Sequence, residues 1–204
     1  MKSICKKISL QKKDKRLISE IEKRIGEFNE FSHKGNKEWF SELCYCLLTA
    51  NSSAALCIKV QREADKENAF LKFDMKKLKK LLRNGGYRFY NKRAEYIINA
   101  RRFSDIKNII KNKNDKEARE WLVKNIKGLG WKEASHFLRN TGRKDVAIID
   151  RHILRCLGEN AKSLNEKNYL RIEKKLENIA EKVKLNLAEL DLYLWSSQTG
   201  TVLK

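Results

Sequence analysis

The chain has 204 residues, and its 46 lysines and arginines outnumber its 26 acidic residues to give a net charge of +20. This excess favours a polyanionic partner, nucleic acid before an anionic membrane surface, although a ribosome-associated or merely lysine-rich protein has the same composition. Hydrophobic residues make up 41% of the chain, which is enough for a folded core and argues against disorder of the whole chain.

The sequence also argues against several other classes of protein. The longest nearly apolar stretch, residues 43–50, is too short to span a bilayer, and no apolar signal segment follows the charged N-terminus. The five cysteines form no CxxC pair, so we expect neither a zinc finger nor an iron–sulfur cluster, and no metal or cofactor. Their odd number indicates reduced thiols in an intracellular protein, where they act as small core residues.

The chain has no proline and only nine glycines, so few positions interrupt helices. Apolar residues at helical spacing and capping residues predict helices over 14–31 and 37–50, from Ser52 or Ser53 through about Gln61, from Asp74 to Gly85, over 91–101, after Ser104, from Asp115, over 132–140, from Asp150, after a capping box at Ser163 and Glu166, and over about 187–197. No useful run alternates with period two. The predicted fold is all-α, with ten or so short helices.

Residues 125–140 combine two predicted helices with a tight turn at Gly128 and Gly130. Glycine suits such a turn because it tolerates positive φ and lets the backbone approach another molecule closely. The N–H groups that open the second helix can bind a phosphate, and Lys127 and Lys132 reinforce this. An ordinary joint between two helices with a glycine cap has the same pattern, but in so basic a chain the pattern favours DNA binding.

Residues 145–156 form an apolar run that ends at Asp150, where a helix is predicted to begin. Aspartate is a common N-cap residue, so Asp150 taken alone is explained as a cap. Asp150 follows Lys132 by 18 residues, and this spacing links the second segment to the first.

A Gly-x-Gly-x-Lys turn followed by an aspartate at the head of a helix resembles the helix-hairpin-helix DNA glycosylase superfamily. Within it, the chain is similar to the type 2 8-oxoguanine DNA glycosylase/AP lyases of archaea and some thermophilic bacteria. The resemblance covers roughly residues 14–204. It is carried by LLTAN at 47–51, RFYNKRAEYI at 88–97, GWKEASHFLRN at 130–140, DLYLW at 191–195, and a chain end on Lys204.

The resemblance implies that Lys132 and Asp150 are catalytic. The Lys132 amine would attack C1′ of the damaged nucleoside, expel the base and form a Schiff base, and β-elimination would then cut the strand. An amine is required because a hydroxyl cannot form an iminium, and the amine must first lose its proton. Asp150 would stabilise the oxocarbenium-like transition state. Without the motif, Lys132 would be one more solvated lysine.

The damaged base must leave the duplex to be reached, so the enzyme needs a pocket with flat surfaces. Trp195 and Phe89 are the candidates for stacking on the base, and the resemblance implies that the C-terminal carboxylate of Lys204 reads its edge. Asn51 would fill the vacated space in the duplex. The plainer alternatives are core packing for Trp195, a frayed end for Lys204 and a helix cap for Asn51.

The same resemblance implies contacts to the DNA backbone. His152 matches a phosphate-contacting position, Arg88 belongs to a basic patch beside Phe89, and Gly128 and Gly130 would approach the backbone. No transition metal is implied. A monovalent cation is possible, in the DNA-bound state, at the backbone carbonyls of Lys124, Ile126 and Leu129.

We therefore predict a two-lobed helix-hairpin-helix DNA glycosylase fold with the active cleft between the lobes. One lobe would combine residues 1–49 and 146–204, and the central lobe would span 50–145 with the hairpin at about 117–140. The predicted function is excision of 8-oxoguanine from double-stranded DNA and cleavage at the abasic site. The enzyme would be a monomer without membrane contact, in the cytoplasm near the nucleoid of a prokaryote.

Two other functions fit parts of the pattern. An oxidised-pyrimidine glycosylase of the same superfamily would share the hairpin, but the absent iron–sulfur cysteines and Lys204 argue against it. A non-catalytic helix-hairpin-helix module would bind DNA without turnover, and the presence of both Lys132 and Asp150 argues against that.

Overall fold

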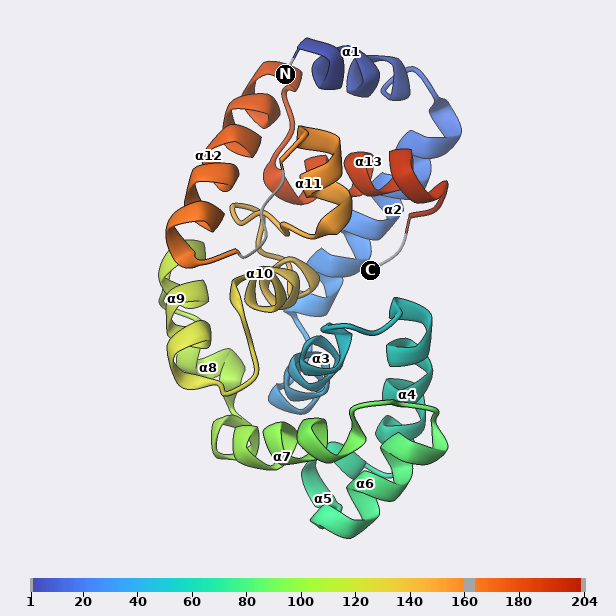
Figure 1. The fold of residues 1–204 in the computed structure, drawn as a ribbon, viewed down its shortest axis with the longest axis vertical. Helices are drawn as coiled ribbons and strands as arrows, with labels where there is room; N and C mark the ends of the chain where they lie inside the picture. Colours follow the sequence, from blue (N-terminus) through green and yellow to red (C-terminus); the bar gives the residue numbers. More distant parts are fainter. Residues whose placement is uncertain (1, 160–163, 203–204) are drawn as a thin grey trace. The chain divides into compact units, whose positions relative to one another are not determined.

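The computed structural model describes residues 2–159 and 164–202, and every regular element within them is helical (Figure 1). In chain order these are α1 (Lys2–Gln11), α2 (Lys15–Ser32), α3 (Asn36–Thr49), α4 (Ala54–Lys66), α5 (Ala69–Lys72), α6 (Met75–Asn84), α7 (Tyr90–Ala100), the 3-10 helix η1 (Arg101–Phe103), α8 (Ile106–Ile110), α9 (Asp115–Asn125), α10 (Trp131–Asn140), α11 (Arg151–Leu157), α12 (Glu166–Val183) and α13 (Leu187–Thr199). The predicted all-α fold is confirmed. No helix in these ranges is long and apolar enough to cross a membrane.

Capping residues explain why many helices begin where the sequence predicts. The side chains of Asp14, Ser53 and Asp74 accept backbone N–H bonds in the first turns of α2, α4 and α6. Each cap satisfies a donor that has no partner inside the helix, so the start of the helix is encoded locally.

The structure confirms one predicted helix start and corrects another. Helix α9 begins at Asp115 as predicted, and its N-cap is Asn114, whose side chain and that of Glu117 form a capping box. Asn165 caps α12, whereas the predicted cap Ser163 lies outside the described residues. The sequence also does not predict α5, which has four residues, or α1, whose one buried apolar residue, Ile8, relies on packing against distant helices.

Contacts divide the chain into two compact units. Unit 1 is Met1–His33 with Leu138–Lys204, and unit 2 is Lys34–Phe137. Unit 1 is therefore discontinuous in sequence, but the boundaries differ from those predicted. Residues 34–49 belong to unit 2 because α3 packs on α4, α7 and α8, and residues 138–145 belong to unit 1, where Gly142 lies against α2.

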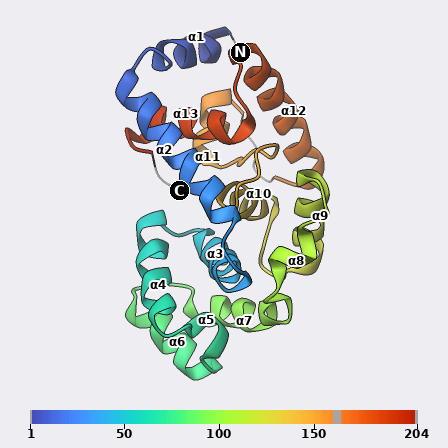
Figure 2. The same ribbon diagram turned by 180° about the vertical axis from the view of Figure 1, so that it is seen from behind.

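In unit 1, helices from both ends of the chain lie side by side, as Figures 1 and 2 show. Helix α1 packs on α12 and α13, and α13 also contacts α2 and α11. The buried Arg139 near the end of α10 pairs with Asp191 of α13, and its guanidinium lies 5.0 Å from the ring centre of Phe28 on α2. A buried ion pair needs such close partners to offset its desolvation. The pair joins α10 to α13, and the contact with Phe28 joins α10 to α2.

In unit 2, α3 is the central helix. All its residues from Trp39 to Thr49 are buried, as expected for a helix that is apolar on most of its faces. Helices α4, α7 and α8 pack around it, and α6 packs on α7. The edge of Trp39 meets Phe137 at a centroid distance of 5.8 Å, which joins the start of α3 to α10.

Candidate functional site

The predicted hairpin is present as α9, a turn and α10. In the turn, the N–H of Leu129 donates to the carbonyl of Ile126 at 3.1 Å, and Gly130 accepts from Ala134 at 2.9 Å to open α10. Gly128 has a φ of +91°, and a Cβ built there would lie 2.2 Å from Cδ2 of Tyr96. Both the backbone conformation and the close approach of α7 therefore require glycine at position 128.

Lys132 is the second residue of α10, directly after the turn. Its side chain is 27% exposed, and its Nζ lies 3.6 Å from Oε1 of Glu133. From Ala134 to Asn140 the helix is buried. The hairpin thus presents Lys132 at the exposed, electropositive N-terminal turn of an otherwise buried helix.

The Cys57 thiol of α4 interacts electrostatically with both Lys132 and Arg93. Burial raises the pKa of the Cys57 thiol on α4, and the positive charges of Lys132 and Arg93 act against this rise. The guanidinium of Arg93 donates to the carbonyl of Ala50 at 3.2 Å. Asn51, which follows Ala50 in the chain, is exposed and has a φ of +58°, a conformation typical of the residue that follows a helix cap.

The segment between α6 and α7 carries an exposed aromatic residue among cations. Phe89 is 38% exposed, and the guanidinium of Arg88 lies 5.2 Å from its ring centre. The Tyr87 hydroxyl donates to the carbonyl of Leu48, which anchors this segment to the end of α3. An exposed ring beside a guanidinium is suited to stacking on a nucleic acid base.

In unit 1, Asp150 is the N-cap of α11. Its Oδ1 accepts the backbone N–H groups of His152 at 2.8 Å and Ile153 at 2.9 Å. Within the described residues, Oδ2 makes no hydrogen bond. The plain prediction of a cap is confirmed, and one carboxylate oxygen stays available for another role.

The structure brings His152 and Trp195 together. Their rings meet nearly edge to face, with centroids 4.8 Å apart, although the residues belong to α11 and α13. Both residues are half-buried, and neither Nδ1 of His152 nor Nε1 of Trp195 has a hydrogen-bond partner within the described ranges. Buried polar atoms usually have a partner, so these two atoms depart from the common pattern.

The model of the 8-oxoguanine DNA glycosylase family matches residues 21–185. This chain belongs to that family. The match includes both the hairpin and Asp150.

Curated relatives and solved structures agree with this membership. An 8-oxoguanine DNA glycosylase/AP lyase of Methanocaldococcus jannaschii is 55% identical over 191 residues, 90% of this chain and 91% of that protein. Another, of Aquifex aeolicus, is 43% identical over 93% of this chain and 97% of that protein.

The crystal structure of the Methanocaldococcus jannaschii enzyme in complex with a 15mer DNA containing 8-oxoguanine matches with a TM-score of 0.95 at 52% identity over all of both chains. The 8-oxoguanine DNA glycosylase of Thermotoga maritima matches with a TM-score of 0.91 at 37% identity, also over all of both chains. The helix-hairpin-helix glycosylase fold is thereby confirmed.

Some predicted site residues stay predictions. Lys204 lies outside the described residues. Of the three hairpin carbonyls, that of Ile126 accepts the N–H of Leu129, and a carbonyl oxygen has a second lone pair for a cation. Lys132 belongs to unit 2 and Asp150 to unit 1.

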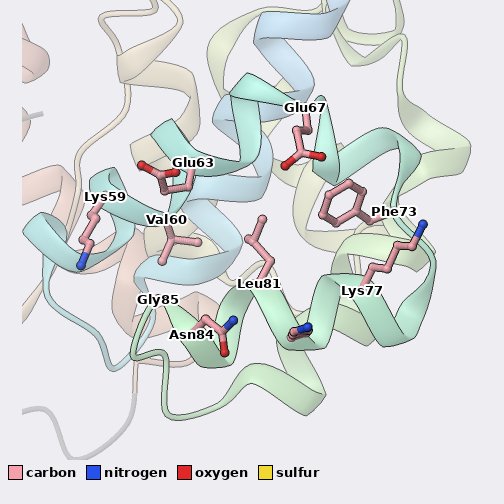
Figure 3. Close-up of a pocket in the computed structure, with 10 residues that line it drawn as sticks. Lys59, Val60, Glu63, Glu67, Phe73, Lys77, Leu81, Asn84 and Gly85 are labelled. Atoms are coloured by element: carbon pink, nitrogen blue, oxygen red, sulfur yellow. The ribbon is translucent and has the colours of Figure 1, made fainter.

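A hollow of about 470 Å³ lies between α4 and α6 (Figure 3). Val60 and Leu81 point into it, and Lys59, Glu63 and Lys77 surround it. None of the predicted site residues lines this hollow, and both lysines and glutamates lie around it. The mixed charges around the hollow therefore do not indicate which class of ligand it would bind.

Sequence reasoning missed two residues that shape the hairpin. Tyr96 lies against Gly128, and Glu133 lies beside Lys132. Nothing along the chain predicts the first contact, because Tyr96 belongs to α7. The second could have been suspected, since an acidic residue in the first turn of a helix is a common capping signal.

Proposed function

We propose that this chain removes 8-oxoguanine from DNA and then cleaves the strand at the abasic site, with Lys132 as the nucleophile. The observation that carries the proposal is the hairpin turn, which holds Lys132 part-exposed in the first turn of α10. The family match spans this turn, and relatives that match 90% or more of the chain are named 8-oxoguanine DNA glycosylase/AP lyases.

The chemistry follows from a neutral amine at position 132. Its nitrogen attacks C1′ of the damaged nucleoside as the bond from C1′ to the base breaks, and the base leaves with a proton. The sugar ring opens as the nitrogen forms an iminium with C1′, which acidifies the proton on C2′. Loss of this proton expels the 3′ phosphate by β-elimination and cuts the strand. A hydroxyl nucleophile could not form the iminium.

Asp150 is the proposed stabiliser of positive charge on the sugar. Its Oδ1 is held by two backbone N–H groups, which orient the carboxylate, while Oδ2 is available to face the substrate. The cap and the catalytic role use different oxygens, so one residue can perform both. A carboxylate in this role lowers the energy of an oxocarbenium-like transition state.

Two aromatic residues are proposed to hold the flipped base. The exposure of Phe89 and the unpartnered Nε1 of Trp195 support stacking or edge contacts with a base. His152, which packs on Trp195, is proposed to contact a phosphate. Asn51 is proposed to fill the vacated duplex position, and Lys204 to read the lesion.

The partner is double-stranded DNA that contains oxidised guanine. The net charge of +20, the cation Arg88 and the backbone N–H groups near Gly128 and Gly130 support binding to phosphates. We further propose that the enzyme acts as a monomer in the cytoplasm. Binding that stayed constant between low and moderate salt would contradict a DNA partner.

Borohydride trapping on a duplex with one 8-oxoguanine tests the proposal. Borohydride reduces an iminium to a stable adduct, so it reports the Schiff base directly. We expect the wild type to form a covalent complex with DNA and Lys132→Gln to form none, while both bind the duplex. A second duplex that carries thymine glycol measures whether oxidised pyrimidines are processed instead.

Two results would contradict the proposal. If wild type and variant both bind but neither is trapped, the chain is a binding module and not a lyase. If the thymine glycol duplex is trapped and the 8-oxoguanine duplex is not, the chemistry is right but the substrate is a different oxidised base.

A further inference from the structure

Glu133 is a largely buried carboxylate beside the proposed nucleophile. Its side chain is 13% exposed, and its Oε1 lies 3.6 Å from Nζ of Lys132. In the described parts of the chain it has no other ion-pair or hydrogen-bond partner. Carboxylates are rarely buried without compensation, because loss of hydration destabilises the charged form. The compensating charge here is the Lys132 ammonium.

The backbone of the hairpin makes room for this carboxylate. Glu133 is the third residue of α10, and a Cβ built on Gly130 would lie 3.0 Å from its Oε2. A larger residue at position 130 would therefore displace the carboxylate. The positive end of the helix macrodipole favours a negative charge at this place. One oxygen of Glu133 thus lies against the turn, and the other faces Lys132.

We propose that Glu133 is a positioning residue that holds the Lys132 side chain over the N-terminal turn of α10. The proposal rests on the proposed function, because positioning matters only if Lys132 is the nucleophile. A lysine side chain has four rotatable bonds, and an ion pair at one end restricts its rotamers before DNA binds. The neutral amine that forms when the ammonium loses its proton then starts from this restricted position. Since covalent attack requires the reacting atoms within about 3–3.5 Å and aligned, the restriction speeds attack on C1′.

Charge, and not side-chain shape, is the property that Glu133 contributes. The separation of 3.6 Å between Nζ and Oε1 is an ion-pair distance that is longer than an ordinary hydrogen bond. A glutamine keeps the size of the side chain but loses the charge, while an aspartate keeps the charge on a shorter side chain. The relative excision rates of these two variants therefore distinguish positioning by charge from simple packing.

The experiment compares Glu133→Gln and Glu133→Asp in the full chain. Single-turnover excision and borohydride trapping are measured on the 8-oxoguanine duplex, together with DNA affinity and thermal stability. We expect E133Q to slow excision and adduct formation about tenfold with DNA affinity within twofold of wild type. E133D should stay within about threefold of wild type. Glu117→Gln is the matched control, because Glu117 is the third residue of α9 in the same hairpin, and its rates should equal those of wild type.

Three results would overturn the inference. E133Q at the wild-type rate, E133D slower than E133Q, or E133Q faster than wild type would each show that the charge does not position the nucleophile. If E133Q unfolds, the excision rate of E133D alone distinguishes the two roles, since a packing role predicts a large loss of rate for the shorter side chain. Failure of the proposed function is seen separately, because the wild-type enzyme itself would then form no adduct.

Discussion

In unit 2 the proposed nucleophile is placed by the shape of the backbone, whereas in unit 1 Asp150 is placed by hydrogen bonds to its own side chain. The hairpin before Lys132 depends on Gly128, whose φ is +91° and which lies against Tyr96. The position of Asp150 depends on two N–H groups that its Oδ1 accepts. We expect the first arrangement to tolerate no larger side chain, and the second to tolerate any side chain that can cap a helix.

The largest expected effect comes from separating the two roles of Asp150. Asn is as good an N-cap as Asp, so Asp150→Asn should keep the free energy of unfolding within about 0.5 kcal/mol of wild type. Loss of the carboxylate charge should lower the single-turnover excision rate about 1,000-fold, or about 4 kcal/mol. Chemical denaturation and single-turnover kinetics measure the two quantities. Asp150→Ala, which removes the cap as well, should lose stability in addition, and full activity in D150N would remove Asp150 from the chemistry.

The next effect concerns the shape of the hairpin. Gly128→Ala would place a methyl group into the ring of Tyr96 at a positive φ, and the strain and overpacking should lower the free energy of unfolding by about 3 kcal/mol. Urea denaturation measures this loss. Gly26→Ala is the control, because a Cβ there meets nothing within 4 Å in the middle of α2 and should slightly stabilise the protein. Equal stability of both variants would contradict the steric role of Gly128.

A smaller effect is expected at the exposed ring of unit 2. Phe89→Ala should weaken binding to the 8-oxoguanine duplex about tenfold, because base stacking on an aromatic ring contributes on the order of 1–3 kcal/mol. Stability should change by less than about 0.5 kcal/mol, since the ring is 38% exposed. Fluorescence anisotropy measures the affinity. Leu170→Ala removes an equally exposed side chain in unit 1, and a similar loss of affinity there would show that the effect at Phe89 is unspecific.

The smallest effect is electrostatic and belongs to unit 1. Hydrogen bonds from Arg171, at 2.8 and 3.1 Å, and from Lys175 lower the pKa of the Glu159 carboxyl to about 2. Because this value is below the unfolded value of about 4.3, the stabilisation is present above pH 4.3 and is lost as the pH falls through about 2.

Glu159→Gln should therefore lower the free energy of unfolding at pH 7 by less than about 1 kcal/mol, since solvent screens the pair. The difference from wild type should shrink as the pH is lowered from 5 toward 2, as followed by urea denaturation. Excision at pH 7 should not change. A difference that grew toward low pH would contradict the direction of this pKa shift.

Much of the fold could be read from the sequence because helices are encoded locally. The caps at Asp14, Ser53 and Asp74 and the apolar stripes that follow them are short-range patterns. Helix α1 could not be predicted in this way, since it has one buried apolar residue, Ile8, and packs on α12 and α13 from the other end of the chain. The boundary of unit 2 was missed for the same reason, because the contacts of α3 assign it to that unit.

The candidate site also combines features that the sequence indicates with contacts that it does not. Its residues Lys132 and Asp150 follow from a motif and its spacing, and their catalytic roles stay predictions that the trapping experiment tests. The contact of Tyr96 with Gly128 and that of His152 with Trp195 join residues of different helices, so no spacing along the chain indicates them.

The all-helical class, the glycine hairpin, the cap at Asp150 and the resemblance to the 8-oxoguanine DNA glycosylase family can all be recognised in the sequence alone. These features depend on neighbours within a few turns of the chain or on short motifs. Two features are seen only in the folded protein: the ring of Tyr96 leaves no room for a Cβ at Gly128, and the largely buried carboxylate of Glu133 lies beside Lys132. Both depend on close packing, in which the space left by one residue is set by atoms that other elements bring there.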